Sequence, residues 1–175
     1  MSKELNRRIS ISWSRYWSLK EILKSPSIPI SEKRKIFNTC ILPVLTYGCQ
    51  TWAMTKLNNQ RLKVCQHKME RSMLNIKLQD KWRLSKIRAI TKVTDVTTRI
   101  KRLKWRWTGH MMRSQKEKWT KEITVWYPRN GKRRRGRQVK RWEDDLPQGW
   151  RRYSQDRVKW GELEEAYVER RPDHQ

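Results

Sequence analysis

Residues 99–142 read RIKRLKWRWTGHMMRSQKEKWTKEITVWYPRNGKRRRGRQVKRW, and this stretch sets the charge of the whole chain. It holds 17 Lys or Arg residues, two acids, and five of the protein's 11 Trp residues. Its surplus of 15 positive charges over 44 residues repels itself unless a counter-charge is present. Cations interleaved with flat indole rings suit a polyanion with stacking bases, so we expect nucleic acid as the partner.

The composition of the full chain agrees with this expectation. Its 175 residues carry a net charge of +26 and a pI near 10.7, which is typical of proteins that bind DNA or RNA. An anionic membrane surface is a weaker alternative, because no basic amphipathic helix stands alone at a terminus. No apolar run approaches the roughly 20 residues that span a bilayer. We expect RNA or DNA as partner, without a membrane or a small-molecule substrate.

Cysteine usage favours a reducing compartment. The chain has three cysteines, Cys40, Cys49 and Cys65, and their spacing forms no disulfide framework and no zinc-binding pair. The first residues are charged and lack the apolar run of a signal peptide. An intracellular location is therefore expected, either nuclear or shared between nucleus and cytoplasm.

Apolar periodicity predicts a mainly α fold: a small helical bundle, followed by a basic, partly disordered arm and a terminal helix. The predicted N-caps are Ser31, Thr55 and Asp80, and a longer helix is expected to start at Asp95. Pro43 lies inside an apolar helical pattern and predicts a kink, because proline lacks the amide donor. Further helices are expected over 4–24, 117–126 and 156–168, with a helical turn over 142–146.

The helix that begins at Asp95 carries the first half of the basic stretch. Its apolar residues recur at steps of three and four, which predicts a buried face of Val96, Ile100, Leu103, Trp107 and Met111. Trp105 lies off that stripe and is therefore a candidate for stacking on a base. Tyr47 and Trp52 are expected in the core, and Gly109 is expected to permit close helix packing or a bend.

The run KRRRGRQVKR, Lys132 to Arg141, has no apolar face apart from Val139 and is called the basic arm below. Its cations are expected to contact phosphates independently of sequence, and a nuclear-localisation signal is a compatible interpretation. Asp144 and Asp145 follow it and are expected to be salt-bridged or capping rather than metal-binding. The full set of predicted nucleic-acid contacts is Arg99, Lys101, Arg102, Lys104, Trp105, Arg106, His110, Arg113, Lys132, Arg133, Arg134, Arg135, Arg137, Lys140 and Arg141.

Four segments resemble, in the same order, the reverse transcriptases of LINE-type (non-LTR) retrotransposons beyond the catalytic palm. KIFNTCILPVLTYGCQTW, residues 35–52, resembles the segment that ends in a YG-x-x-x-W turn. LKWRWTGHMMR, 103–113, resembles the W-x-GH-x-x-R element, and RRRGRQVKRWEDDL, 133–146, resembles RRRGRP-x-x-RW-x-DDL with Gln138 in place of Pro. QDRVKWGELEEAY, 155–167, resembles the closing D-R-x-x-W-x-x-LEEA helix.

The resemblance implies a C-terminal part of such an enzyme, in three regions. These are thumb-like helices over 1–77, a basic helical region over 78–127, and the basic arm with a terminal amphipathic helix over 128–175. The family's polymerase holds magnesium with an F/Y-x-DD turn and an upstream Asp, and this sequence has no such turn. We therefore expect no catalysis and no cofactor here, and a role in holding template RNA or primer–template against a palm domain that this chain lacks.

Two alternatives stay open at the level of sequence. The chain is part of an active reverse transcriptase if its true product extends upstream and includes the palm. It is otherwise a host-recruited chromatin or RNA-binding protein, or a decayed copy of the element. The sequence does not separate these, and it leaves the preference between RNA and DNA undecided.

Overall fold

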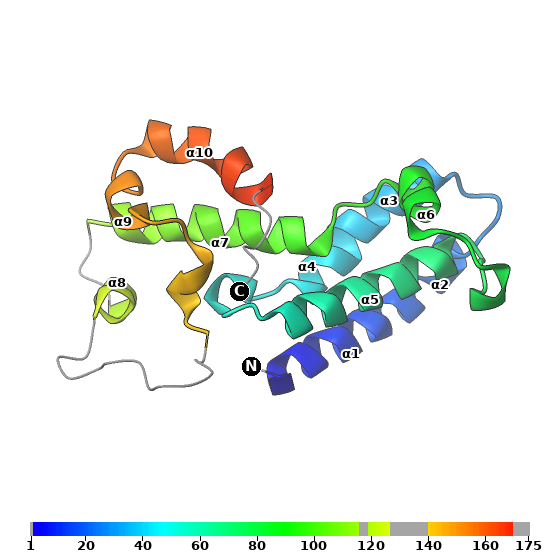
Figure 1. Ribbon diagram of the computed structural model, residues 1–175. Helices are drawn as coiled ribbons and strands as arrows, with labels where there is room; N and C mark the ends of the chain where they lie inside the picture. Colours follow the sequence, from blue (N-terminus) through cyan, green and yellow to red (C-terminus); the bar gives the residue numbers. More distant parts are fainter. Residues whose placement is uncertain (1, 116–118, 127–139, 170–175) are drawn as a thin grey trace. The chain divides into compact units, whose positions relative to one another are not determined.

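The computed structural model describes residues 2–115, 119–126 and 140–169. These residues form helices and turns and no strand, so the prediction of a mainly α protein is confirmed. They divide into two compact units (Figure 1). The first comprises residues 1–49 and 55–100, and the second comprises 50–54 and 101–175. This boundary at residue 100 differs from the three regions expected over 1–77, 78–127 and 128–175, and the basic arm lies largely outside the described residues.

The first unit packs several helices around one apolar core. Helix α1 (Ser2–Ser18) contacts α4 (Leu42–Leu45) and α5 (Lys56–Met73), beside which it runs in Figure 1. Helix α6 (Leu84–Thr91) contacts α3 (Ile30–Ile36) and α5, and α2 (Lys20–Leu23) follows α1 directly. The core of this unit consists of Leu5, Tyr16, Leu23, Phe37, Ile41, Leu42, Leu45, Cys49, Leu62, Cys65, Met69, Met73, Ile87, Val93, Val96 and Ile100.

Next to Pro43, where the sequence predicts a kink, the helix is irregular. A π-helical turn, Phe37–Ile41, separates α3 from α4, and the Leu42 amide bonds back to the Phe37 carbonyl. Proline has no amide to donate to the turn before it, so the helix widens there instead of continuing regularly. Trp52 is buried as expected, but Tyr47 is exposed and the prediction of a core role is wrong. The Arg8 guanidinium lies over the Tyr47 ring, with its central carbon 4.5 Å from the ring centroid.

One of the three predicted N-caps is confirmed, and a helix starts directly after Asp95 as expected. The Thr55 hydroxyl accepts from the Asn58 amide at the start of α5, and Asp95 accepts from the Thr97 and Thr98 amides at the start of α7 (Val96–Arg113). Burial raises the pKa of Asp95, but hydrogen bonds from the Thr97 hydroxyl, the Thr98 amide and Arg88 outweigh it and lower the pKa to about 2. Ser31 is not a cap, because α3 begins earlier, after Pro29. Asp80 instead closes a short 3-10 turn, Leu78–Asp80.

The buried face of α7 is wider than the predicted stripe. Val96, Ile100 and Met111 are buried as expected, whereas Leu103 and Trp107 are only half-buried. Lys104, Trp105, Thr108 and Met112 are buried as well. The periodicity of one helix identifies an apolar face, but it does not reveal a second contact made by a segment far along the chain.

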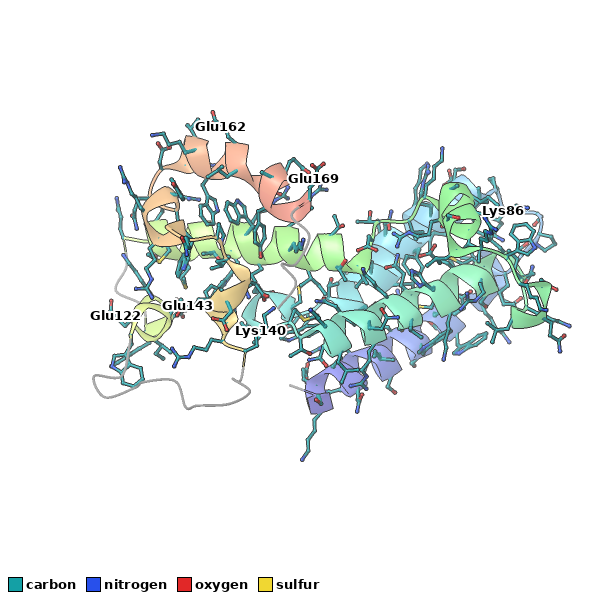
Figure 2. The ribbon with its side chains drawn as sticks, viewed as in Figure 1. Lys86, Glu122, Lys140, Glu143, Glu162 and Glu169 are labelled. Atoms are coloured by element: carbon teal, nitrogen blue, oxygen red, sulfur yellow. The ribbon has the colours of Figure 1, made fainter. Side chains whose placement is uncertain are left out.

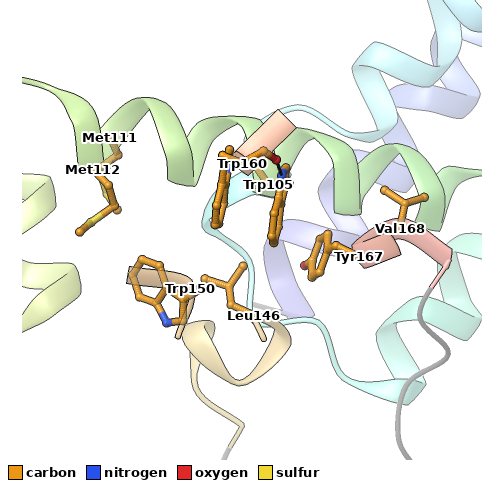
Figure 3. Packing of buried hydrophobic residues seen from close by; sticks show 8 residues of the cluster. All are labelled: Trp105, Met111, Met112, Leu146, Trp150, Trp160, Tyr167 and Val168. Atoms are coloured by element: carbon orange, nitrogen blue, oxygen red, sulfur yellow. Dashed lines mark hydrogen bonds between the residues drawn. The ribbon is translucent and has the colours of Figure 1, made fainter. Parts of the chain in front are cut away.

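That second contact comes from the terminal helix, within the second unit. Trp105 and Trp160 of α10 (Arg157–Glu169) stack with ring centroids 3.6 Å apart and an interplanar angle of 2° (Figure 3). Each indole N–H donates to the backbone carbonyl of the other residue, at 2.8 and 3.0 Å. Tyr167 extends the stack at 4.6 Å. The pair therefore buries two large rings without leaving either polar N–H unpaired.

Gly109 makes this stack possible. A Cβ built at residue 109 would lie 2.4 Å from Trp160 Nε1 and 2.5 Å from its Cδ1, far inside van der Waals contact. The expectation that Gly109 permits close helix packing is confirmed. The remaining core of the unit comes from Met111, Met112, Leu146, Trp150 of α9 (Trp150–Tyr153) and Val168 (Figure 3).

Replacing Gly109 with alanine should destabilise the second unit by about 2 kcal/mol, because the added methyl group overpacks the stack. Gly161→Ala is the matched control, since it changes a helical glycine of α10 that has nothing within 4 Å of the added Cβ. That control should be neutral or stabilising by up to about 1 kcal/mol, because alanine is the better helix former. Urea denaturation followed by tryptophan fluorescence measures both, and equal stabilities for the two variants would contradict the packing argument.

Candidate nucleic-acid interface

The predicted contacts fall into groups with different fates. Arg99 belongs to the first unit, and the contacts from Lys101 to Arg113 and from Lys140 to Arg141 belong to the second. The rest of the basic arm lies outside the described residues, and with it the predicted contacts Lys132, Arg133, Arg134, Arg135 and Arg137.

Two arginines of α7 are paired with carboxylates of α10. Arg102 donates to both oxygens of Glu165 at 2.7 and 2.9 Å, and Arg106 Nε donates to those of Glu164 at 2.8 and 3.1 Å. These bonds and the charge of Glu164 raise the pKa of Arg106 further. The pairs are solvent-accessible, so each contributes at most about 1 kcal/mol to stability. The acidic terminal helix thus neutralises part of the basic surface.

Three further cations of α7 are used to hold the backbone or a side chain. Lys101 Nζ donates to the Val168 carbonyl at 2.8 Å, near the C-terminal end of α10, where a positive charge is favoured. Arg113 donates to the Ser154 carbonyl at 2.8 Å, and Arg99 donates to the Thr46 hydroxyl at 3.1 Å in the first unit. His110 is exposed. These geometries give Arg99, Lys101 and Arg113 structural partners inside the protein.

Lys104 is not a surface cation, and the prediction that it contacts phosphate is wrong. Its side chain is 2% exposed, and burial lowers its pKa while the charge of Asp145 opposes that shift. The ammonium donates to the Trp142 carbonyl at 2.6 Å, to Asp145 Oδ2 at 2.8 Å and to the Trp52 carbonyl at 3.4 Å. It also lies 4.6 Å from the centroid of the Trp142 ring. All three of its donors are therefore satisfied within the unit.

The base-stacking role predicted for Trp105 is wrong as well. The residue is 1% exposed and stacked against Trp160, so its ring would have to leave the core to meet a base. Trp107 and Trp142 are half-buried and pack edge to face at 5.6 Å. The Trp142 indole donates to the Gln50 carbonyl at 2.7 Å.

Among the described residues of the basic stretch, the exposed rings lie on α8 (Trp119–Val125) and directly after it. Trp119 is 83% exposed and Trp126 is 68% exposed, with Ile123 between them at 68%. Three apolar residues at this helical spacing ordinarily indicate a core-facing stripe. The exposures show that these three side chains instead face solvent.

The 3-10 turn Trp142–Asp145 uses both acids of the DD pair. Asp144 Oδ2 accepts from the Arg141 amide at 2.7 Å, and Asp145 pairs with Lys104 and Lys140. Arg141 is half-exposed, and Glu143 pairs with Arg151 at 3.2 Å; Lys140 and Glu143 are labelled in Figure 2. The prediction that Asp144 and Asp145 are salt-bridged or capping is confirmed.

The residues that carry the three later motif resemblances converge on the second unit. Gly109 accommodates the Trp160 ring, and Arg113 bonds to Ser154. Leu146 is a core residue, and Asp156 accepts from the Val158 and Lys159 amides to cap α10. These motifs, which are separated in sequence, are thus parts of one packed structure.

One comparison with known proteins found a relative. The chain is 32% identical over 150 residues to a putative uncharacterized transposon-derived protein of Caenorhabditis elegans. The present chain is therefore related to a transposon-derived protein. The match covers 82% of this chain and 52% of that protein, so the chain spans about half the length of the relative. No protein-family model matches the chain, and no solved structure matches it.

The described residues contain neither a membrane-spanning helix nor a candidate metal site. None of the helices in this part of the chain is both long and apolar enough to cross a bilayer. The same residues contain no cluster of three or more His, Cys, Asp or Glu side chains placed to hold a metal ion.

Lys104→Met should destabilise the protein by about 3 kcal/mol, because it leaves buried acceptors and part of the Asp145 charge without their ammonium. Lys159→Met is the control, since the Lys159 side chain is 69% exposed and its ion pair with Asp156 is long, at 3.9 Å. That variant should stay within about 0.5 kcal/mol of the parent. Equilibrium urea unfolding measures both, and a Lys104→Met protein as stable as the parent would show that the buried ammonium is dispensable.

Proposed function

We propose that this chain binds nucleic acid without transforming it, as the C-terminal part of a LINE-type reverse transcriptase. One observation carries the proposal. Most cations of α7 in the second unit are engaged by carboxylates or carbonyls, whereas the basic arm contains no acid in its sequence. Lys140 of the arm pairs with Asp145, but the run from Lys132 to Arg137 carries its cations with no acid among them.

Two further findings support the proposal. The relative is described as transposon-derived, and the four segments that resemble the retrotransposon family occur in the family's order. The later three of them supply core and capping contacts of one unit, so their spacing has a common structural cause. In the parent enzyme this part would hold template RNA or primer–template beside the palm, and the cationic run would also serve a nuclear protein as a localisation signal.

The proposed mechanism is phosphate neutralisation with stacking. Each phosphate that a cation neutralises releases condensed counterions, which makes the affinity fall as salt rises. Trp119 and Trp126 precede the arm in sequence and expose their rings, so they replace Trp105 as the candidates for stacking on unpaired bases. Contacts to phosphate position the chain without reading sequence.

Binding to a single-stranded oligonucleotide should weaken with salt, with a log–log slope of roughly −4 for about six neutralised phosphates. Arg133→Gln/Arg134→Gln should reduce the magnitude of that slope by about 1.4, because two phosphate contacts are lost. Fluorescence anisotropy titrations between low and moderate salt measure the slope.

The matched control removes two arginines that are already paired. Arg102→Gln/Arg106→Gln deletes the same charge from α7, where Glu165 and Glu164 hold both guanidinium groups. Its slope should stay close to that of the parent. If the α7 pair of substitutions lowers the slope more than the arm pair, the arm is not the principal binding segment and the proposal fails in this form.

We further propose that the chain by itself does not polymerise. Two-metal polymerase chemistry needs carboxylates free to bind magnesium, and the DD pair here is engaged in capping the turn and in pairing with Lys104 and Lys140.

The purified 175-residue chain should extend no primer on an RNA template in the presence of magnesium. A primer-extension gel with a known reverse transcriptase as positive control measures this. Extension that persists through Asp144→Asn/Asp145→Asn would point to other carboxylates, and any extension by the parent chain would contradict the non-catalytic proposal.

A further inference from the structure

Residues 74–86 of the first unit form an exposed cationic segment, which lies outside the basic stretch of residues 99–142. Met73 at the end of α5 and Ile87 in α6 are buried, but no residue from 74 to 86 is buried. The segment is therefore anchored at both ends by core residues, while its own side chains remain at the surface.

Local hydrogen bonds define the backbone of this segment. The Ile76 amide donates to the Arg71 carbonyl at 3.0 Å, and the Lys77 amide donates to Asp80 Oδ2 at 2.8 Å. Lys81 then takes a left-handed conformation, with φ of 49°, before α6 begins. Asp80 is the one acid of residues 74–86, and its carboxylate accepts a hydrogen bond from the backbone.

One cation of the segment lies over a tryptophan ring, and others neighbour that tryptophan in sequence. Trp82 is 38% exposed, and Lys86 Nζ lies 4.0 Å from the centroid of its ring. Lys77, Lys81 and Arg83 are exposed, and no carboxylate of the described residues pairs with them or with Lys86. Lys86 lies on α6 and is labelled in Figure 2. These five residues are called the Trp82 surface.

We infer that the Trp82 surface is a second contact for single-stranded nucleic acid, in which an unpaired base stacks on Trp82. The flat ring offers a stacking platform that accepts any base. The Lys86 ammonium at the ring and the exposed cations that neighbour Trp82 in sequence supply positive charge for the phosphates of the same strand. The inference rests on nucleic acid being the partner, as proposed above, but it assigns a different unit and different residues.

A lipid surface fits these residues less well. Leu78 is 76% exposed and would suit an acyl boundary. However, the Lys86 ammonium lies over the Trp82 ring, and Lys81 and Arg83 are its neighbours in sequence. Insertion of Trp82 into a bilayer would therefore remove these three charges from water, which is costly. A strand of nucleic acid meets the same charges with phosphates, so the arrangement favours a polynucleotide.

The test compares Trp82→Ala with Leu78→Ala in the full chain. Binding of a fluorescein-labelled oligothymidylate of about 20 nucleotides should weaken about tenfold in Trp82→Ala, because one stacked base is lost. Leu78→Ala removes an exposed apolar side chain of the same segment and should change the affinity less than about twofold. A matched duplex should lose less than about twofold in either variant, since its bases are already stacked.

The contribution of charge has its own signature. Lys81→Gln/Arg83→Gln should reduce the magnitude of the single-strand salt slope by about 1.4, whereas Trp82→Ala should leave the slope unchanged. Urea unfolding midpoints equal to the parent's would show that all variants retain their fold. Photocrosslinking with an oligonucleotide that contains 5-bromouracil should identify Trp82 in the crosslinked peptide.

Several results would overturn the inference. These are unchanged single-strand binding in Trp82→Ala, an equal loss in Leu78→Ala, or an equal loss on the duplex. A loss confined to phosphatidylserine vesicles would identify the surface as a membrane contact instead. If Arg133→Gln/Arg134→Gln keeps the parental slope while Trp82→Ala loses tenfold, the arm proposal fails and this one stands.

Discussion

A lysine ammonium that is withdrawn from water must find acceptors, and the second unit is arranged around that requirement. Lys104 reaches carbonyls of Trp52 and Trp142 and the carboxylate of Asp145. Two segments that are far apart in sequence, one at Trp52 and the other at Trp142–Asp145, thereby meet one side chain of α7. Because an uncompensated charge in such a place is costly, any arrangement that loses one of these segments is disfavoured.

The stacked indoles complete the same unit from the other direction. Trp105 and Trp160 satisfy each other's backbone carbonyls while burying their rings, and Gly109 leaves the space that this requires. In a chain with only 35% hydrophobic residues, such rings supply much of the core that aliphatic side chains supply elsewhere. The same aromatic residues that suggested a nucleic-acid surface therefore build the interior.

Charge in this protein divides into two kinds with different consequences. Arginines of α7 meet glutamates of α10, so their field is reduced before any ligand arrives. The cations of the Trp82 surface have no such partner among the described residues, and the basic arm has no acid within its own sequence, although Lys140 pairs with Asp145. A net charge of +26 thus favours a polyanionic partner. The ion pairs within the protein determine which cations remain available to bind that partner.

The sequence alone determined the helical class, the cap at Thr55, the helix start at Asp95 and the irregularity of the helix at Pro43, because each depends on neighbours within one or two turns. Its motifs also indicated a transposon-related chain. Tertiary structure decided that Trp105 and Lys104 are interior and that Tyr47, Trp119 and Trp126 are exposed. It also decided which arginines are paired. Those outcomes depend on contacts more than 35 residues apart, such as Lys104 with Asp145 and Trp105 with Trp160, which the period of a single helix does not encode.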